Sequence, residues 1–113
     1  MTPTPRGRVL IIAGSDSGGG AGIQADLKTI SACGAYAMTA ITAITTQDPG
    51  GVRNVWPVSA EQLCDQIEAA LAYRPAAIKI GMLATPEVIA ALLDSGCAGE
   101  SIQAVLRSVP PKF

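Results

Sequence analysis

The sequence predicts an α/β fold with a mostly parallel sheet, and three observations carry that prediction. Short apolar runs of strand length alternate with segments whose apolar residues recur at helical spacing. A glycine-rich stretch joins the first apolar run to the first helical segment, as in a strand–loop–helix unit. Proline and glycine stand between the other segments and mark where each one ends. Regular alternation of this kind is typical of helices that flank a parallel sheet.

The first part of the chain is predicted to form a strand, a loop, a helix and a second strand. An apolar run predicts a buried strand over 8–13, and a helix is expected over 21–33. Gly34 is suited to the left-handed conformation that ends many helices. The second strand is expected over 37–45. The residues that recur at i, i+4 and i+7 on one face of the helix are Ile23, Leu27 and Ile30.

The middle of the chain contains its strongest turn signal, Asp-Pro-Gly-Gly, which predicts a loop over 46–53. A short strand is expected over 54–58, and Pro57 places it at an edge of the sheet or ends it early. A serine followed three residues later by a glutamine is a capping-box pattern, so a helix is expected from Ser59 to about Ala72.

The third main strand is predicted over 76–80, after the short strand at 54–58, and Thr85 then caps a helix whose first residue is Pro86 and which Gly96 closes. Beyond that point small and polar residues stand where the alternation requires another buried strand. We therefore expect three parts: a disordered or loosely held N-terminus over 1–7, the N-terminal part of one domain over 8–96, and an atypical tail over 97–113. The domain is expected to be incomplete.

Composition excludes several classes of function. The net charge is −1 and no cluster of Lys or Arg occurs, which argues against nucleic-acid binding. The apolar stretches have strand length, and the polar N-terminus lacks a secretory pattern, so we expect no membrane span and a cytoplasmic location. The absence of histidine removes Ser-His-Asp catalysis, and the three widely spaced cysteines argue against a zinc site.

The glycine-rich loop is the strongest candidate for a ligand site. Its glycines allow backbone N–H groups to approach a ligand at a helix N-terminus. Its spacing fits neither the phosphate-binding loop of nucleotide-hydrolysing enzymes nor the dinucleotide fingerprint. The alternative is that the glycines only permit a tight turn and close packing of strand on helix. The glycines concerned are Gly14, Gly18, Gly19, Gly20 and Gly22.

Five polar or flexible residues near this loop have two interpretations each. Asp16 either caps the helix or faces a ligand, and Asp26 either complements the helix dipole or belongs to the site. Gln47 and Met82 follow two strands, at the end where open α/β sheets bind ligands. Gln47 is otherwise a plain loop residue, and Met82 otherwise fills the core. Lys79 either extends to an edge or pairs with a carboxylate.

Four blocks of the sequence together resemble the N-terminal part of the hydroxymethylpyrimidine/phosphomethylpyrimidine kinases of the ribokinase-like superfamily. The longest block is 13–29, and the others agree in order and spacing over 34–36, 39–47 and 79–83. The resemblance covers about 8–96. It implies a partial ribokinase-like fold, in which a mostly parallel sheet lies between helices in three α/β/α layers.

The resemblance also implies ATP- and magnesium-dependent phosphate transfer in thiamine biosynthesis. The acceptor is first 4-amino-5-hydroxymethyl-2-methylpyrimidine and then its monophosphate. It implies that the Gln47 amide pairs with the ring, and that Gly14, Met82 and Asp26 lie around it. The loop that floors this pocket includes Asp16, Gly18, Gly19 and Gly20. The full-length family is expected to form homo-oligomers.

The family's catalytic glycine-threonine-glycine-cysteine motif and most of its ATP site match nothing in these 113 residues. No catalytic residue is therefore assigned, and we expect the chain to be inactive alone. Two other possibilities stay open. One is a pyridoxal-type kinase of the same superfamily. The other is a non-catalytic fragment that binds a ligand or depends on a partner.

Overall fold

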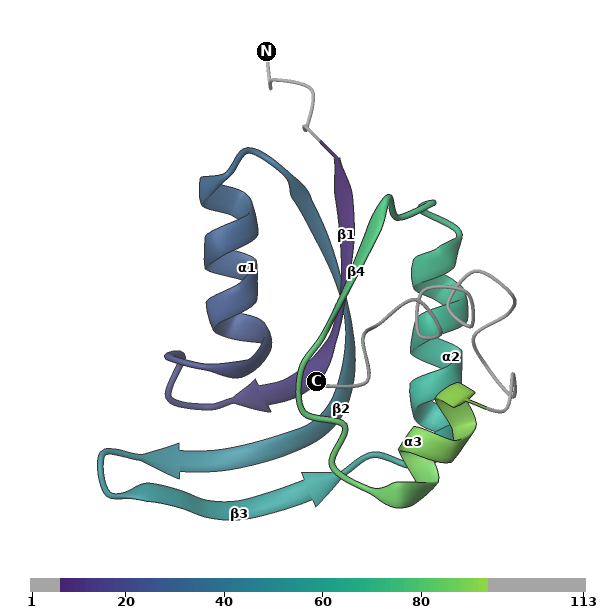
Figure 1. The fold of residues 1–113 in the computed structure, drawn as a ribbon. Helices are drawn as coiled ribbons and strands as arrows, with labels where there is room; N and C mark the ends of the chain where they lie inside the picture. The colour runs from purple at the N-terminus through teal and green to yellow at the C-terminus, as the bar shows by residue number, and fades with distance from the viewer. Residues whose placement is uncertain (1–6, 94–113) are drawn as a thin grey trace, which may run out of the picture.

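The computed structural model describes residues 7–93, so the predictions for 1–6 and 94–113, including the end of the last helix at Gly96, lie outside the described residues. Within 7–93 four strands and three helices follow one another (Figure 1). They are β1 (Arg8–Asp16), α1 (Gly22–Ala32), β2 (Tyr36–Asp48), β3 (Gly51–Pro57), α2 (Ala60–Leu71), β4 (Ala77–Ile80) and α3 (Pro86–Leu93).

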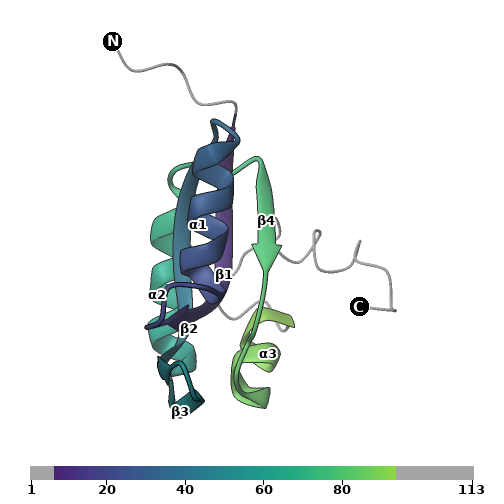
Figure 2. The ribbon, with the colours of Figure 1, turned by 90° about the vertical axis from the view of Figure 1, so that its left-hand side faces the viewer.

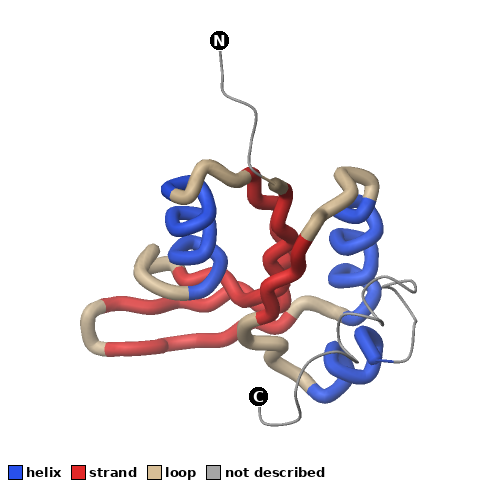
Figure 3. The backbone as a smooth tube through the Cα atoms, turned by 45° about the horizontal axis from the view of Figure 1, so that its top comes forward, coloured by secondary structure: helices blue, strands red, loops and turns tan. Residues whose placement is uncertain are grey.

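The four strands form one mixed sheet in the order β3-β2-β1-β4 (Figure 3). β1 is paired in parallel with both β2 and β4, and β3 runs antiparallel to β2. The α/β class and the mostly parallel sheet are therefore confirmed. β3 lies at one edge of this sheet and ends at Pro57, as its proline requires.

Helices cover both faces of the sheet, which gives three layers (Figures 1 and 2). α1 packs on one face through a small cluster of buried residues: Ile11, Ala13 and Ile23. α2 and α3 pack on the other face. The larger cluster of buried residues there comprises Leu10, Ile12, Met38, Ala40, Leu63, Ile67, Ala70, Val88 and Leu92. Alternate residues of β1 thus enter opposite cores, as expected for a central strand buried on both faces.

The first two strands are longer than the sequence predicts. β1 continues to Asp16, and β2 continues to Asp48 and joins β3 through a tight turn at Pro49 and Gly50. The predicted loop over 46–53 is therefore wrong, because the turn chemistry of Asp-Pro-Gly-Gly serves a β-hairpin. The Asp48 carboxylate accepts a hydrogen bond from the N–H of Gly50 at 2.8 Å, which favours this turn.

The predicted helix boundaries agree with the structure. The Ser59 hydroxyl accepts from the N–H of Gln62, and the Gln62 side chain accepts from the N–H of Ser59, so the capping box of α2 is complete. The Thr85 hydroxyl accepts from the N–H of Val88 at the start of α3. Gly34 has a φ of 79°, in the left-handed region, just after α1.

A side chain closes part of the outer edge of β2. β3 pairs with β2 only from Ala43 onward, which leaves Ile41 without a strand partner on that side. The Gln66 side chain of α2 accepts from the N–H of Ile41 at 2.8 Å and donates to its carbonyl at 3.0 Å. The Gln66 amide therefore makes the two hydrogen bonds that a neighbouring strand would make.

Candidate functional site: a ring-sized pocket at the strand ends

A pocket of about 210 Å³ lies where β1 and β2 end and the hairpin begins. Five segments supply its walls: the ends of β1 and β2, the start of α1, the hairpin strand β3, and the loop after β4. The residues that line it are Gly14, Ser15, Asp16, Ala21, Gly22, Thr45, Gln47, Val52, Val55 and Met82. The structure thus brings together five of the residues selected from the sequence, namely Gly14, Asp16, Gly22, Gln47 and Met82.

An extra residue in β3 explains why the sequence did not indicate Val52 and Val55. Thr45 pairs with Val55 and Gln47 pairs with Val52, although the valines are three residues apart. The register shift at Arg53 accounts for the odd spacing. A bulge therefore places two valines that strict alternation assigns to opposite faces on the same face, opposite Thr45 and Gln47. Only the register of the hairpin contains that information.

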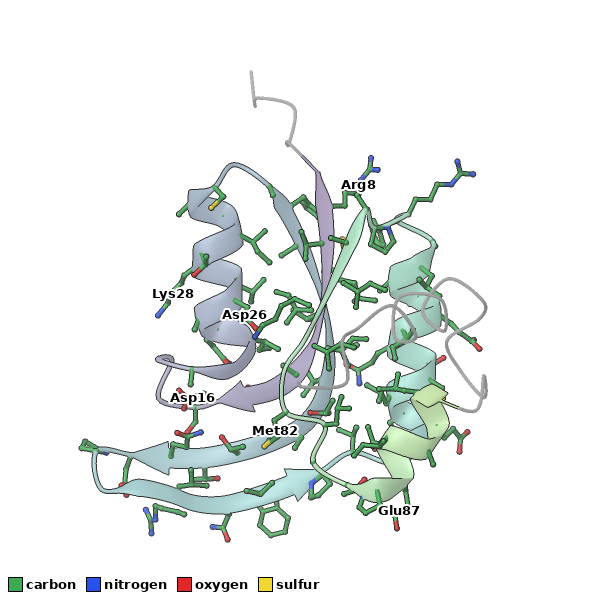
Figure 4. The ribbon with its side chains drawn as sticks, in the orientation of Figure 1. Arg8, Asp16, Asp26, Lys28, Met82 and Glu87 are labelled. Carbon is green, nitrogen blue, oxygen red and sulfur yellow. The ribbon has the colours of Figure 1, made fainter. Side chains whose placement is uncertain are left out.

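A buried threonine holds the loop that carries Met82. The Thr42 hydroxyl donates to the carbonyl of Met82 at 2.6 Å, across the end of β1. Gly14 lies next to both residues, and a Cβ on Gly14 would stand 2.8 Å from the Met82 Cε. The Met82 side chain is 47% exposed, so it lines the pocket rather than filling the core (Figure 4).

The Asp16 carboxylate organises the glycine loop. It accepts hydrogen bonds of 2.8–2.9 Å from the N–H groups of Gly18, Gly20 and Ala21. The bond from Gly18 is the main cause that lowers the pKa of Asp16 below its ordinary value of 3.8. The other two amides and the charge of Lys28 act in the same direction, whereas burial opposes them. Asp16 therefore neutralises the N–H groups that could have held an external anion.

Three of the predicted site glycines, Gly18, Gly19 and Gly20, lie outside the pocket lining. Gly19 has a φ of 78°, and its carbonyl accepts a hydrogen bond from the Lys28 ammonium at 2.7 Å. Gly22, where α1 begins, has a φ of 57°. A Cβ on Gly22 would lie 2.4 Å from the carbonyl oxygen of Gly14. Tight turning and close packing of strand on helix therefore account for part of the glycine run.

Asp26 lies apart from the pocket lining. Its carboxylate accepts a hydrogen bond from the Lys79 ammonium of β4 at 2.8 Å. Figure 4 shows Asp26 on the side of α1 that faces the sheet and Lys28 on the outer side. Of the two interpretations of Lys79, the carboxylate pair is the one observed. The pair links α1 to β4.

Two further properties of the described residues bear on function. None of the helices within 7–93 has the length and apolar character needed to cross a bilayer. The same residues contain no group of three or more His, Cys, Asp or Glu side chains able to hold a metal ion.

The chain is similar in sequence to kinases of vitamin metabolism. The sequence model described as phosphomethylpyrimidine kinase matches residues 16–109. A hydroxymethylpyrimidine/phosphomethylpyrimidine kinase of Rhizobium meliloti is 56% identical over 86 residues, which are 75% of this chain and 32% of that protein. The chain thus spans about a third of the length of this relative.

Two solved structures have the same fold. A phosphomethylpyrimidine kinase from Clostridium difficile superposes with a TM-score of 0.75 at 50% identity, over 79% of this chain and 39% of that one. A pyridoxal kinase from Staphylococcus aureus in complex with pyridoxal superposes with a TM-score of 0.68 at 48% identity, over 74% and 31% of the two chains. The partial ribokinase-like fold is therefore confirmed, and the chain belongs to the phosphomethylpyrimidine kinase family.

Proposed function

We propose that the pocket binds the ring of 4-amino-5-hydroxymethyl-2-methylpyrimidine and of its monophosphate. On this proposal the chain supplies the ring-binding part of a kinase that phosphorylates these compounds with ATP in thiamine biosynthesis. One observation carries the proposal: Gly14, Gln47 and Met82, chosen from a resemblance to pyrimidine kinases, line one pocket. Membership of the phosphomethylpyrimidine kinase family supports the same proposal.

The chemistry of the lining suits a flat polar ring. Val52, Val55 and the Met82 thioether offer apolar surface to its faces, and a thioether packs well on an aromatic ring. Gln47 offers a donor and an acceptor on one planar amide, which matches an amino group beside a ring nitrogen. Gly14 contributes backbone without a side chain at the crowded end of β1.

We assign the transfer of phosphate to residues other than 7–93. The N–H groups of the glycine loop are bonded to Asp16, so they offer no cradle for a transferring phosphate. The described residues contain no group of three or more His, Cys, Asp or Glu side chains, and we assign none of them to magnesium. No step through ATP or magnesium is therefore derived for them. The Gly-Thr-Gly-Cys motif does not occur in the 113 residues, so we expect binding without turnover.

A pyridoxal-type kinase is the second candidate, and the similarity to the Staphylococcus aureus pyridoxal kinase favours it. Both rings are flat six-membered heteroaromatics with a hydroxymethyl substituent, so the apolar walls do not separate them. The edge that faces Gln47 does separate them, because pyridoxal has no amino group beside its ring nitrogen.

Calorimetric titration of the 113-residue chain with each compound tests the proposal. We expect the aminopyrimidine to bind more tightly than pyridoxal, and Gln47→Leu to remove most of that preference. A chain that binds neither compound contradicts the proposal, and a chain that prefers pyridoxal supports the second candidate. The matched control is Gln62→Leu, because Gln62 caps α2 outside this pocket.

An assay of phosphate transfer from ATP, run beside the titration, tests the expected inactivity. Turnover above background would show that the chain contains catalytic groups that we have not assigned. Binding without turnover is also what a non-catalytic fragment would show. The two possibilities differ when a further polypeptide is added: phosphate transfer is restored under the proposal, and it is not restored for a non-catalytic fragment. The cytoplasmic location, the homo-oligomer and the absence of nucleic-acid binding stay predictions.

A further inference from the structure

The amide of Gln47 is held on its nitrogen side. Its Nε2 donates to the Thr45 hydroxyl at 2.9 Å, and the Thr45 hydroxyl donates to the carbonyl of Ser15 at 2.8 Å. Thr45 is 5% exposed, and all three residues line the pocket. The Gln47 backbone is fixed as well, since its N–H donates to the Ser17 hydroxyl at 2.7 Å and its carbonyl accepts from the same hydroxyl at 3.2 Å.

The direction of these bonds follows from their chemistry. A carbonyl oxygen only accepts, so the single proton of the Thr45 hydroxyl goes to Ser15. Thr45 is then an acceptor toward Gln47, and only the nitrogen of the Gln47 amide can donate to it. The nitrogen is therefore turned toward Thr45, and Oε1 is turned away from it. Thr45 selects one of the two flipped states of the amide.

This choice fixes the order of donor and acceptor that a ligand meets. One N–H of Gln47 is taken by Thr45, which leaves Oε1 and the other N–H along the free edge of the amide. An exocyclic amino group would donate to Oε1, and the adjacent ring nitrogen would accept from the free N–H. A 4-oxo ring in its N–H form presents the reverse order. If the ring keeps the same orientation, so that its 5-hydroxymethyl group stays in place, the amide must flip to pair with it, which places Oε1 against an acceptor that has no proton to give.

We propose that Thr45 is a positioning residue that makes the pocket select a 4-amino ring over a 4-oxo ring. The inference rests on the proposed function and deepens it. Thr45 does not contact the ring in this proposal; it acts through the orientation of Gln47. Thr45→Val tests it, because valine keeps the size of the side chain and removes the hydroxyl. Thr45→Ser is the matched variant that keeps the hydroxyl.

The probes are 4-amino-5-hydroxymethyl-2-methylpyrimidine and its 4-oxo analogue, titrated calorimetrically into the 113-residue chain and both variants. The quantity compared is the dissociation constant of the 4-oxo analogue divided by that of the 4-amino compound. We expect this ratio to fall roughly three- to tenfold in Thr45→Val, the range expected for one lost hydrogen bond. In Thr45→Ser the ratio should stay within about twofold of the original. A general loosening of the pocket would weaken both ligands and leave the ratio unchanged.

An unchanged ratio in a folded Thr45→Val chain overturns the inference and leaves the proposed function standing. Failure of the original chain to bind either ring overturns the proposed function and this inference with it. A measurement on the ligand-free original chain covers the case in which Thr45→Val does not fold. The two side-chain amide protons of Gln47 should then exchange with solvent at different rates in NMR spectra, the one bonded to Thr45 more slowly. Equal, fast exchange of both protons overturns the inference.

Discussion

The glycine loop and the β2–β3 hairpin border the same pocket, but they treat their polar groups in opposite ways. In the loop, the Asp16 carboxylate and the Lys28 ammonium bind the backbone N–H and carbonyl groups that the turn exposes. In the hairpin, Val52 and Trp56 are 58% and 61% exposed, and every residue of β3 is open to solvent. The polar backbone groups of the loop are hydrogen-bonded to nearby side chains, whereas the hairpin exposes apolar side chains that a ligand can cover.

This difference indicates which of the two segments can bind a ligand. A donor that is already bonded must give up that bond to bind a ligand, so a satisfied loop contributes shape more than affinity. The free edge of the Gln47 amide gives up only hydrogen bonds to water, and exposed apolar side chains gain free energy when a ligand covers them. On the proposed function, the segment with the most conspicuous sequence is a scaffold, and the less conspicuous hairpin and strand ends carry the contacts to the ring.

The largest expected effect on stability comes from a substitution of Gly22, where the glycine loop joins α1. Gly22→Ala places a Cβ 2.4 Å from the carbonyl oxygen of Gly14 and in a backbone conformation with a φ of 57°. Strain and overpacking together should lower the free energy of unfolding by about 3 kcal/mol or more. Gly20→Ala is the control, since its Cβ would meet nothing closer than 3.9 Å. Urea unfolding measures both, and equal losses would contradict the assignment of Gly22 to packing.

A smaller effect concerns pH and Asp16. The folded-state pKa of Asp16 is lowered, so its contribution to stability is complete above the ordinary value of 3.8 and is lost as the pH falls through the lower folded value. Urea unfolding at pH 5 and pH 3 should show a larger loss of stability in the original chain than in Asp16→Asn, whose side chain does not titrate. Other carboxylates affect both chains alike, so the difference between them is the measurement. Parallel losses would show that Asp16 does not hold the loop.

The smallest expected effect on stability comes from the hairpin. Val52→Thr replaces a methyl group by a hydroxyl on an exposed side chain, so the free energy of unfolding should change by less than about 0.5 kcal/mol. Affinity for the aminopyrimidine should nevertheless fall about fourfold, since roughly 0.8 kcal/mol of apolar contact is removed. Ile44→Thr is the control, an exposed hairpin residue outside the pocket lining. A fourfold loss in Ile44→Thr as well would refute the assignment of Val52 to the pocket.

Local patterns predicted much of the fold because the signals are local. The apolar run in β1, the helical spacing in α1 and the capping box of α2 each depend on residues close together in the chain. The hairpin failed for the opposite reason. Asp-Pro-Gly-Gly indicates a turn correctly, but whether strands continue up to that turn depends on pairing between β2 and β3, which a one-dimensional pattern does not contain.

The pocket was predicted in part for a similar reason. Gln47 and Met82 follow strands, so the rule that ligands bind at the carboxyl ends of parallel strands finds them. Val52 and Val55 share a face only because Arg53 is an extra residue in β3, and bulges have no reliable sequence signal. The bonds from Thr42 to Met82 and from Thr45 to Ser15 join segments distant in sequence, so no spacing rule predicts them.

β3 continues directly from β2 along the chain. The hydrogen bonds of the Gln66 amide nevertheless make part of the edge of β2 independent of the hairpin. Because Gln66 already satisfies Ile41, the sheet does not rely on β3 at that level. Changes in the length or composition of the hairpin would leave the hydrogen bonds of Ile41 intact. The hairpin beyond Ala43 can therefore change without exposing the N–H and carbonyl of Ile41, which Gln66 keeps bonded at this edge of β2.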